Sequence, residues 1–248
     1  MNRIAYTLLL AMSVCLFSLG CTLHFIMWMH SPNVAEQIAE SNVAILTDDG
    51  FGSGTVFIRR FYDKNGDYAD IRFVMTAAHV VNDYKKVMVV KDIEEEPIVG
   101  KVLYINKVLD ICVLILPTDC VLPAFTRFST VEYPRVGTHL YQCGSPFGKH
   151  GHDSISEGIL SYSCRHSQFG FVDQTTTSVY PGASGGSIRL LNGDFIGITS
   201  MYLRSDFNYH VPMRVIRKDL AENDLGWLVT GENLPSVEEF NEILKQRI

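Results

Sequence analysis

Three short segments of this chain carry side chains that could act together on a carbonyl group. The first ends in His79, the second is Asp110 at the head of the apolar run 111–116, and the third places Ser184 among glycines. A serine hydroxyl is a weak nucleophile unless a base takes its proton and a third group orients that base. The sequence therefore predicts Ser184 as the nucleophile, His79 as the general base and Asp110 as the orienting carboxylate.

The glycines around Ser184 predict a further component of the same site. Small residues permit a tight turn that aims the backbone N–H groups of Gly182 and Ser184 at one point. A substrate carbonyl oxygen would become an oxyanion there, and the loss of one such donor typically costs about 2.7 to 4 kcal/mol. Each segment alone also has an ordinary structural interpretation, as a strand end or a loop. Their combination on one β-rich chain favours the catalytic interpretation.

The rest of the chain reads as short strands separated by turn signals, a pattern that is typical of a sandwich or barrel. These strands must position the three residues. His79 follows an expected strand at 71–75, and two strands joined by a tight turn are expected at 187–200. Helical signals appear only near the C-terminus. There a capping box from Ser236 to Glu239 precedes an apolar helix face.

The N-terminal region differs from the rest of the chain. Residues 4–29 contain no Asp, Glu, Lys or Arg, and at about 1.5 Å per residue such a helix crosses the roughly 30 Å hydrocarbon core. Arg3 precedes this stretch, and acidic residues come before the next basic one, Arg59. We therefore predict an uncleaved single-pass transmembrane helix with the rest of the chain extracytoplasmic, which is periplasmic in a bacterium. A cleaved secretion signal, or a lipid anchor at Cys21, remains an alternative.

The composition of the chain limits which partners and cofactors we expect. The formal net charge of −6 argues against nucleic acid. Six cysteines in a chain of 248 residues do not form a disulfide framework, and the sequence cannot pair them. His150, His152 and Asp153 could suggest a metal, but on a glycine-rich loop they are more typical of a solvated rim. We predict no metal and no other cofactor.

The order His, Asp, Ser along the chain is that of chymotrypsin-type proteases, and not of subtilisin or the α/β-hydrolases. The chain resembles the HtrA (Deg) branch of the chymotrypsin-fold serine proteases from about residue 43 to 220. The matching motifs are Gly52-Ser53-Gly54-Thr55-Val56, Thr76-Ala77-Ala78-His79-Val80, Gly144-Ser145-Pro146-Phe147-Gly148, Glu157-Gly158-Ile159-Leu160-Ser161, Gln174-Thr175, Pro181-Gly182-Ala183-Ser184-Gly185-Gly186 and Val211-Pro212.

This resemblance implies an all-β fold of two perpendicular six-stranded β-barrels, with the active site in the cleft between them. It also implies a serine endopeptidase that hydrolyses polypeptides through an acyl-enzyme. The expected segments are an anchor at 1–29, a linker at 30–42, a trypsin-like protease domain at 43–220 with barrels at about 43–125 and 126–220, and a C-terminal helical extension at 221–248.

By the same resemblance, the substrate-binding residues are expected to be Ser178, Tyr180, Ser200, Met201, Tyr202, Tyr209 and His210. The edge from Ser200 to Tyr202 would pair with an extended peptide as an added strand. His210 could hydrogen-bond an acidic or amide substrate side chain, although a packed or solvated histidine is the commoner case.

The chain departs from the family pattern at several positions. Thr176 stands where an Asp is usual, and Tyr180 and Ala183 replace two common Asn residues. About 28 residues follow Leu220, too few for the PDZ domain that HtrA proteins usually carry. Two alternatives therefore stay open. One is a catalytically weak module that binds unfolded chains or a partner, and the other is a dedicated processing protease with a single substrate.

Overall fold

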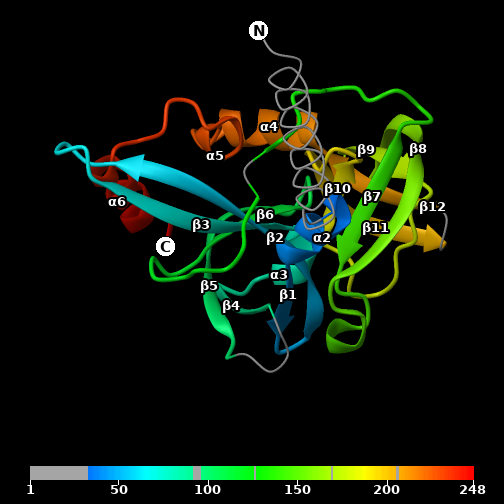
Figure 1. Ribbon diagram of the computed structural model, residues 1–248, viewed down its shortest axis with the longest axis horizontal. Helices are drawn as coiled ribbons and strands as arrows, with labels where there is room; N and C mark the ends of the chain where they lie inside the picture. The colour runs from blue at the N-terminus through cyan, green and yellow to red at the C-terminus, as the bar shows by residue number, and fades with distance from the viewer. Residues whose placement is uncertain (1–32, 92–95, 126, 169, 205–206) are drawn as a thin grey trace, which may run out of the picture. The chain divides into compact units, whose positions relative to one another are not determined.

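Two closed six-stranded barrels make up most of the structure (Figure 1). The computed structural model describes residues 33–91, 96–125, 127–168, 170–204 and 207–248. Neighbouring strands pair antiparallel, in the order β1-β2-β3-β6-β5-β4 in the first barrel and β10-β11-β12-β9-β8-β7 in the second. The expected pair of six-stranded barrels is confirmed.

The strands of the first barrel are β1 (Asn42–Thr47), β2 (Gly50–Tyr62), β3 (Tyr68–Thr76), β4 (Lys86–Val90), β5 (Ile98–Asn106) and β6 (Ile111–Ile115). Those of the second barrel are β7 (His139–Gly144), β8 (Ser154–Ser167), β9 (Gly170–Thr175), β10 (Ser187–Leu190), β11 (Phe195–Arg204) and β12 (Phe207–Pro212). The helices are α2 (Val34–Glu40), α3 (Ala78–Val81), the 3-10 turn η1 (Gly148–Gly151), α4 (Met213–Glu222), α5 (Trp227–Thr230) and α6 (Val237–Arg247).

The first barrel has an apolar interior. Every residue of β6 is buried, and β3 contributes Phe73, Val74 and Met75 to the same core. Glycine allows close packing where β2 crosses β3, because a Cβ at Gly54 would lie 2.5 Å from Cγ1 of Val74. This packing fixes the ends of β3 and β6, which lead to His79 and follow Asp110.

An aromatic cluster packs along the connection between the barrels. Phe125 stacks on Phe195 with ring centroids 5.3 Å apart, and Phe128 meets Phe57 edge to face at 5.3 Å. Phe57 lies on β2 and Phe195 on β11, so the cluster joins strands of both barrels. Aromatic pairs in these arrangements add to the free energy gained from burial alone.

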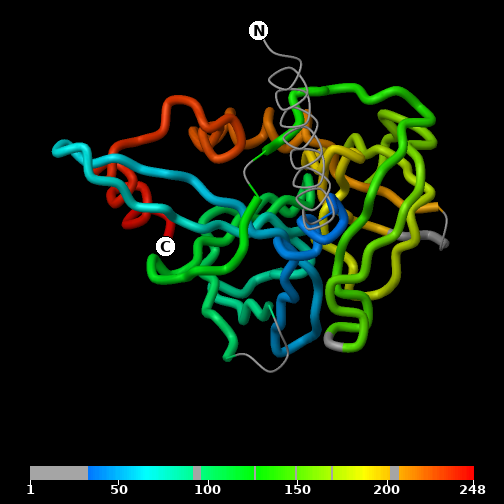
Figure 2. The backbone as a smooth tube through the Cα atoms, in the orientation of Figure 1, coloured from blue at the N-terminus to red at the C-terminus, as the bar shows by residue number. Residues whose placement is uncertain are grey.

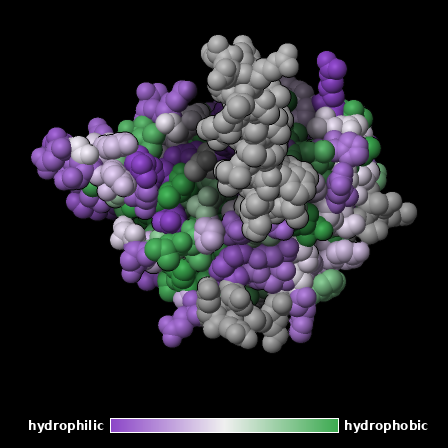
Figure 3. All heavy atoms as spheres, viewed as in Figure 1, coloured by the Kyte–Doolittle hydropathy of each residue, from purple (hydrophilic) through white to green (hydrophobic). Residues whose placement is uncertain are grey.

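The C-terminal helix packs against the projecting hairpin of β2 and β3 (Figure 2). Phe240 of α6 stacks on Phe61 of β2, with ring centroids 4.4 Å apart. The predicted capping box is confirmed, since the Ser236 hydroxyl accepts from the amide of Glu239 and the Glu239 carboxylate accepts from the amide of Ser236. Hydrophilic side chains cover the outer end of the hairpin (Figure 3).

The segment before the first barrel contains more structure than expected. The predicted linker at 30–42 includes the helix α2, whose Ile38 is buried. The predicted transmembrane helix at 4–29 lies outside the described residues. In the part of the chain that the structure describes, no helix has the length and apolar character needed to cross a membrane. Among the described residues, Cys112, Cys120 and Cys143 are buried free thiols and Cys164 is an exposed one.

Candidate active site

His79 and Asp110 are joined at the rim of the first barrel. His79 lies on the short helix α3 directly after β3, and Asp110 lies in the turn before β6. The two carboxylate oxygens of Asp110 lie 2.9 and 2.9 Å from Nδ1 of His79, and one of them accepts the His79 backbone N–H at 3.0 Å. Side chain and backbone of His79 are therefore both bound by one carboxylate.

The burial of the two side chains differs in a way that suits their predicted roles. The Asp110 side chain is 1% exposed, whereas that of His79 is 41% exposed. A buried carboxylate requires donors, and Ser200 on β11 supplies a third by donating its hydroxyl to Asp110. Asp110 has a φ of 58°, a left-handed conformation that Asp tolerates better than most residues. The imidazole is thus fixed on one side and accessible on the other.

Ser184 lies opposite this pair, at the end of a turn in the second barrel. Its hydroxyl donates to the Ser200 carbonyl at 3.3 Å. Ser184 and His79 line one pocket of about 240 Å³, together with Gly182, residues of the β1–β2 turn and Phe51 of β2. The structure therefore brings His79, Asp110 and Ser184 together at the junction of the two barrels.

The turn that carries Ser184 is held through its carbonyl groups. Pro181 O accepts from Phe147 N at 2.8 Å, and Ala183 O accepts at 3.0 Å from the amide three residues further on. The C=O and N–H of a trans peptide bond point in opposite directions. Because these two bonds fix the carbonyl groups of Pro181 and Ala183, the N–H groups of Gly182 and Ser184 point in the opposite direction.

Those two N–H groups are available to a ligand. Neither donates to another residue within the described part of the chain, and both residues line the pocket that contains His79. Gly182 has a φ of 97°, and a Cβ there would lie 2.4 Å from Cε2 of Phe51. Only glycine fits this conformation and this contact. The arrangement can accept an oxyanion beside the Ser184 hydroxyl.

The residues expected to bind substrate lie just before the Ser184 turn and on β11 and β12. Ser178 accepts a hydrogen bond from Ser156 through its carbonyl at 3.0 Å. Tyr180 is 45% exposed, and its ring lies 5.7 Å from that of Phe147. Met201 pairs with Tyr209 in the β11–β12 register.

The edge of β11 near the catalytic residues has a free side. On that side β10 pairs with β11 from Phe195 to Ile198, and Gly185 and Gly186 bind the backbone of Thr199. Within the described residues no strand pairs with that side beyond Thr199. The edge expected to bind substrate, Ser200 to Tyr202, lies in this uncovered part.

His210 is a buried member of the predicted substrate-binding set. It is 1% exposed, and its Nδ1 has no hydrogen-bond partner among the described residues. Burial lowers the pKa of His210 to about 4, while nearby Asp173 opposes and Arg214 reinforces the shift. The imidazole is therefore neutral at physiological pH. Its ring lies against Gly197, where a Cβ would be 2.4 Å from Cδ2 of His210.

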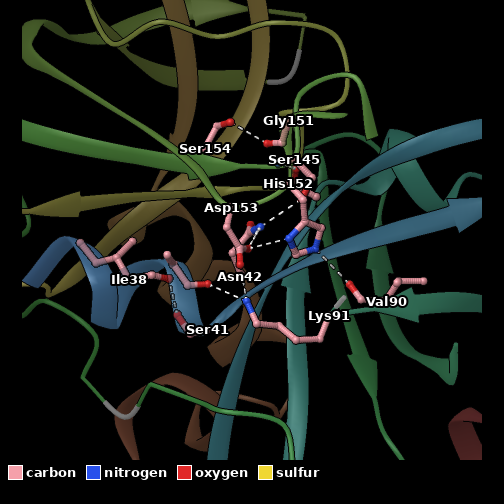
Figure 4. Close-up of polar contacts among 12 residues, drawn as sticks. Ile38, Ser41, Asn42, Val90, Lys91, Ser145, Gly151, His152, Asp153 and Ser154 are labelled. Atoms are coloured by element: carbon pink, nitrogen blue, oxygen red, sulfur yellow. Dashed lines mark hydrogen bonds and ion pairs between the residues drawn. The ribbon is translucent and has the colours of Figure 1, made fainter. Parts of the chain in front are cut away.

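The loop expected as a solvated rim instead joins a polar cluster (Figure 4). Asp153 accepts from Lys91 at 2.6 Å and from Asn42 at 2.8 Å, and it lies 3.1 Å from Nδ1 of His152. The Asp153 hydrogen bond raises the pKa of His152, although burial opposes this. Asn42 also donates to Ser145 at 3.0 Å. Within the described residues, no three His, Cys, Asp or Glu side chains are grouped to hold a metal ion.

Two contributions were missed by sequence reasoning. Ser200 was expected only as part of the substrate edge, yet its hydroxyl binds Asp110. Ser53 was noted only within a Gly-Ser-Gly strand, yet it contacts the Ser184 turn through both its backbone and its hydroxyl. The flanking glycines gave a signal, because close backbone approach indicates that another segment lies against this one.

Comparison with known proteins is consistent with this geometry. The family model described as "Trypsin-like peptidase domain" matches residues 52–198, which is more than half of the chain. A crystal structure of the serine endoprotease from Yersinia pestis superposes with a TM-score of 0.61 and 18% sequence identity, covering 79% of this chain and 68% of that chain. At this identity the likeness shows the fold alone.

Curated relatives carry serine protease names. "Serine protease HtrA-like" from Staphylococcus aureus is 24% identical over 221 residues, which cover 82% of this chain and 28% of that protein. "Serine protease Do-like HtrA" from Bacillus subtilis is 26% identical over 168 residues, which cover 64% of this chain and 35% of that protein. The chain thus spans about a third of the length of these relatives.

Proposed function

Because the chain belongs to the trypsin-like peptidase family, we propose that it is a serine endopeptidase that uses Ser184, His79 and Asp110. One observation carries the proposal. A buried carboxylate binds the imidazole of His79 on one side, and a serine on a glycine turn shares a pocket with the other side. This arrangement supports a role for Ser184 as a nucleophile with His79 as its base.

In the proposed mechanism, the Ser184 hydroxyl passes its proton to Nε2 of His79 as its oxygen attacks the substrate carbonyl carbon. Asp110 stabilises the imidazolium that forms and holds it in position. The carbonyl oxygen becomes an oxyanion, which the N–H groups of Gly182 and Ser184 bind. His79 then gives the proton to the leaving amine as the C–N bond breaks. Water activated by His79 hydrolyses the resulting ester on Ser184.

The substrate would bind as an extended strand along the free side of β11. Backbone groups from Ser200 to Tyr202 would pair with it, as in recognition by strand addition. Ser178 and Tyr180 would line one wall of the pocket for the residue before the scissile bond, and Met201 and Tyr209 another. The neutral His210 would lie at the base of this pocket, where it favours an amide or protonated acid over a cation.

The distinguishing experiment compares the intact protein with the variant Ser184→Ala on casein and on a peptide library. The intact protein should cleave both, and the variant should retain its melting temperature and cleave neither. Cleavage by Ser184→Ala would overturn the mechanism. Peptide binding without cleavage by the intact protein would favour the binding module. Cleavage of one library sequence with no action on casein would favour a dedicated processing protease.

We also propose that the protein acts outside the cytoplasm, anchored by residues 4–29. The support is the length and charge pattern of that segment. One relative, from Chlamydia trachomatis, carries the name "Probable periplasmic serine endoprotease DegP-like". Mass spectrometry of the mature N-terminus tests the anchor, since a first residue beyond about position 20 would contradict it.

A further inference from the structure

Ser53, a residue of the first barrel, binds the Ser184 turn at two points. Its backbone N–H donates to Ser184 O at 2.7 Å, and its hydroxyl donates to Gly182 O at 2.6 Å. Ser53 lies on β2 and is fully buried. The bonds therefore cross from one barrel to the other and are shielded from water, so no solvent molecule readily replaces them.

The direction of the Ser53 hydroxyl is itself fixed. Its oxygen accepts the backbone N–H of Ser145 at 2.7 Å while its proton goes to Gly182 O. Ser145 is held in turn, because Asn42 donates to its hydroxyl at 3.0 Å and also binds Asp153 (Figure 4). The hydroxyl thus lies between a fixed donor and the turn that it holds.

The turn needs such a restraint. Gly182 and Gly185 have φ angles of 97° and 86°, and glycine reaches alternative backbone conformations at little cost. Gly182 O belongs to the peptide unit between Gly182 and Ala183, which links the two units that carry the proposed oxyanion donors, the N–H groups of Gly182 and Ser184. Rotation of this middle unit changes ψ at Gly182 and φ at Ala183, and these two angles set how the neighbouring units are oriented relative to each other. A bond to Gly182 O therefore adds to the restraint that the bonds to Pro181 O and Ala183 O place on the donors.

We propose that Ser53 is a positioning residue for the oxyanion hole, acting through the hydrogen bond from its hydroxyl to Gly182 O. This inference rests on the proposed peptidase function. Ser53 touches neither substrate nor reacting atoms. It holds the turn so that the two N–H groups meet the oxyanion of the transition state. Its loss should therefore slow the chemical step and leave ground-state binding of the substrate nearly unchanged.

The structure offers a matched control two residues along the same strand. Thr55 is also fully buried, and its hydroxyl has no hydrogen-bond partner among the described residues. The comparison is therefore between Ser53→Ala and Thr55→Val in the full chain. Each removes one buried hydroxyl from β2, and only the first removes a bond to the Ser184 turn. Ser53→Cys replaces the hydroxyl with a slightly larger thiol that is a weaker donor, and it serves if the alanine variant folds poorly.

Steady-state kinetics on a fluorogenic peptide give the first measurement. For Ser53→Ala, kcat should fall about 10- to 100-fold with KM within about twofold of the intact protein, as expected for a misplaced catalytic group. The kcat of Ser53→Cys should lie between those of Ser53→Ala and the intact protein, and the kcat of Thr55→Val should match that of the intact protein. Equal kcat for Ser53→Ala and Thr55→Val would overturn the inference, as would a Ser53→Ala defect confined to KM.

Amide hydrogen exchange across residues 180–186 gives a second measurement that requires no activity. Exchange in this turn should quicken in Ser53→Ala and not in Thr55→Val, while exchange elsewhere in β2 stays alike in both. Unchanged exchange in the turn would overturn the inference. An intact protein that neither cleaves nor reacts would contradict the proposed function instead, and the exchange result would still decide whether Ser53 holds the turn.

Discussion

The two barrels share a topology and differ in what they bury. The first encloses a continuous apolar core that includes Val56, Val74 and Leu114. The apolar cluster inside the second is smaller, and its buried members are Leu140, Leu160, Ile188 and Ile196. Buried polar residues occupy much of the rest of the second barrel: Gln142, Asp173, Gln174, Thr175, Thr177, Ser187, Arg189, Thr199, Asn208 and His210.

The difference in buried residues suggests that the first barrel mainly supports catalytic residues and that the second mainly binds the substrate. The first barrel supplies Ser53 from within β2, and His79 and Asp110 from segments next to β3 and β6. Apolar packing fixes these three strands. The second barrel carries Ser184 and the proposed substrate pocket, where polar groups are needed to meet a substrate. Buried polar groups stabilise a fold only when they are paired. The stability of the second barrel should therefore depend on its polar pairs as well as on its small apolar cluster. Removal of one polar partner should destabilise it strongly.

The largest expected effect lies in the first barrel. Asp110→Asn should lower kcat by about 10⁴-fold, because an amide donates where the carboxylate accepts and so favours the wrong tautomer of His79. Steady-state kinetics check this, with Asp70→Asn as a control at the surface pair with Arg60. The proposed role of Asp110 fails if Asp110→Asn retains more than about a tenth of the intact activity.

The next effect tests the polar interior of the second barrel. Arg214 binds Asp173 at 2.8 Å, with side chains 9% and 1% exposed. Burial raises the pKa of Asp173, but the hydrogen bonds and charge of Arg214, together with the Cys164 amide, outweigh it and leave the pKa below its ordinary value. Arg214→Met should therefore lower the free energy of unfolding by about 3 to 5 kcal/mol, because it leaves a buried carboxylate unpaired.

Urea denaturation measures that loss, and Leu114→Ala in the first barrel provides the comparison at about 2 to 5 kcal/mol. Comparable losses of unfolding free energy in the two variants would support the view that polar pairs stabilise the second barrel as apolar packing stabilises the first. A loss below about 1 kcal/mol for Arg214→Met, with Leu114→Ala in its expected range, would contradict it.

Sequence patterns indicated short strands and the candidate catalytic residues because these depend on local signals, and the family resemblance supplied the pair of six-stranded barrels. Strand alternation, a glycine turn, the motif around His79 and the motif around Ser184 are each contained within a few consecutive residues. The contacts of Ser53 with the Ser184 turn, and of Ser200 with Asp110, join residues far apart in sequence. A serine gives no local sign of its distant partner. The helix α2 was missed because it is short and only its Ile38 is buried.

The smallest effect concerns pH and again involves the second barrel. Burial lowers the pKa of His210 to about 4 in the folded protein. In the unfolded chain the same side chain is protonated already near pH 6.5. The stability that His210 contributes is complete above pH 6.5 and is lost as the pH falls towards 4. Asp173, with its lowered pKa, titrates mostly below this window.

His210→Gln removes this titration. Between pH 7 and 4.5, the intact protein should lose up to about 3 kcal/mol more stability than the variant. Thermal melts across that range measure the difference. Parallel losses in the two proteins would show that His210 does not resist protonation in the folded state.

The central claim is that groups from the two barrels form one nucleophilic site, and covalent labelling tests it most directly. The intact protein and His79→Ala are treated with a fluorophosphonate, and the modified residue is located by mass spectrometry. The account predicts one adduct, on Ser184, that forms rapidly in the intact protein and is almost absent from His79→Ala. Labelling at another residue, or equally fast labelling of Ser184 without His79, would contradict it.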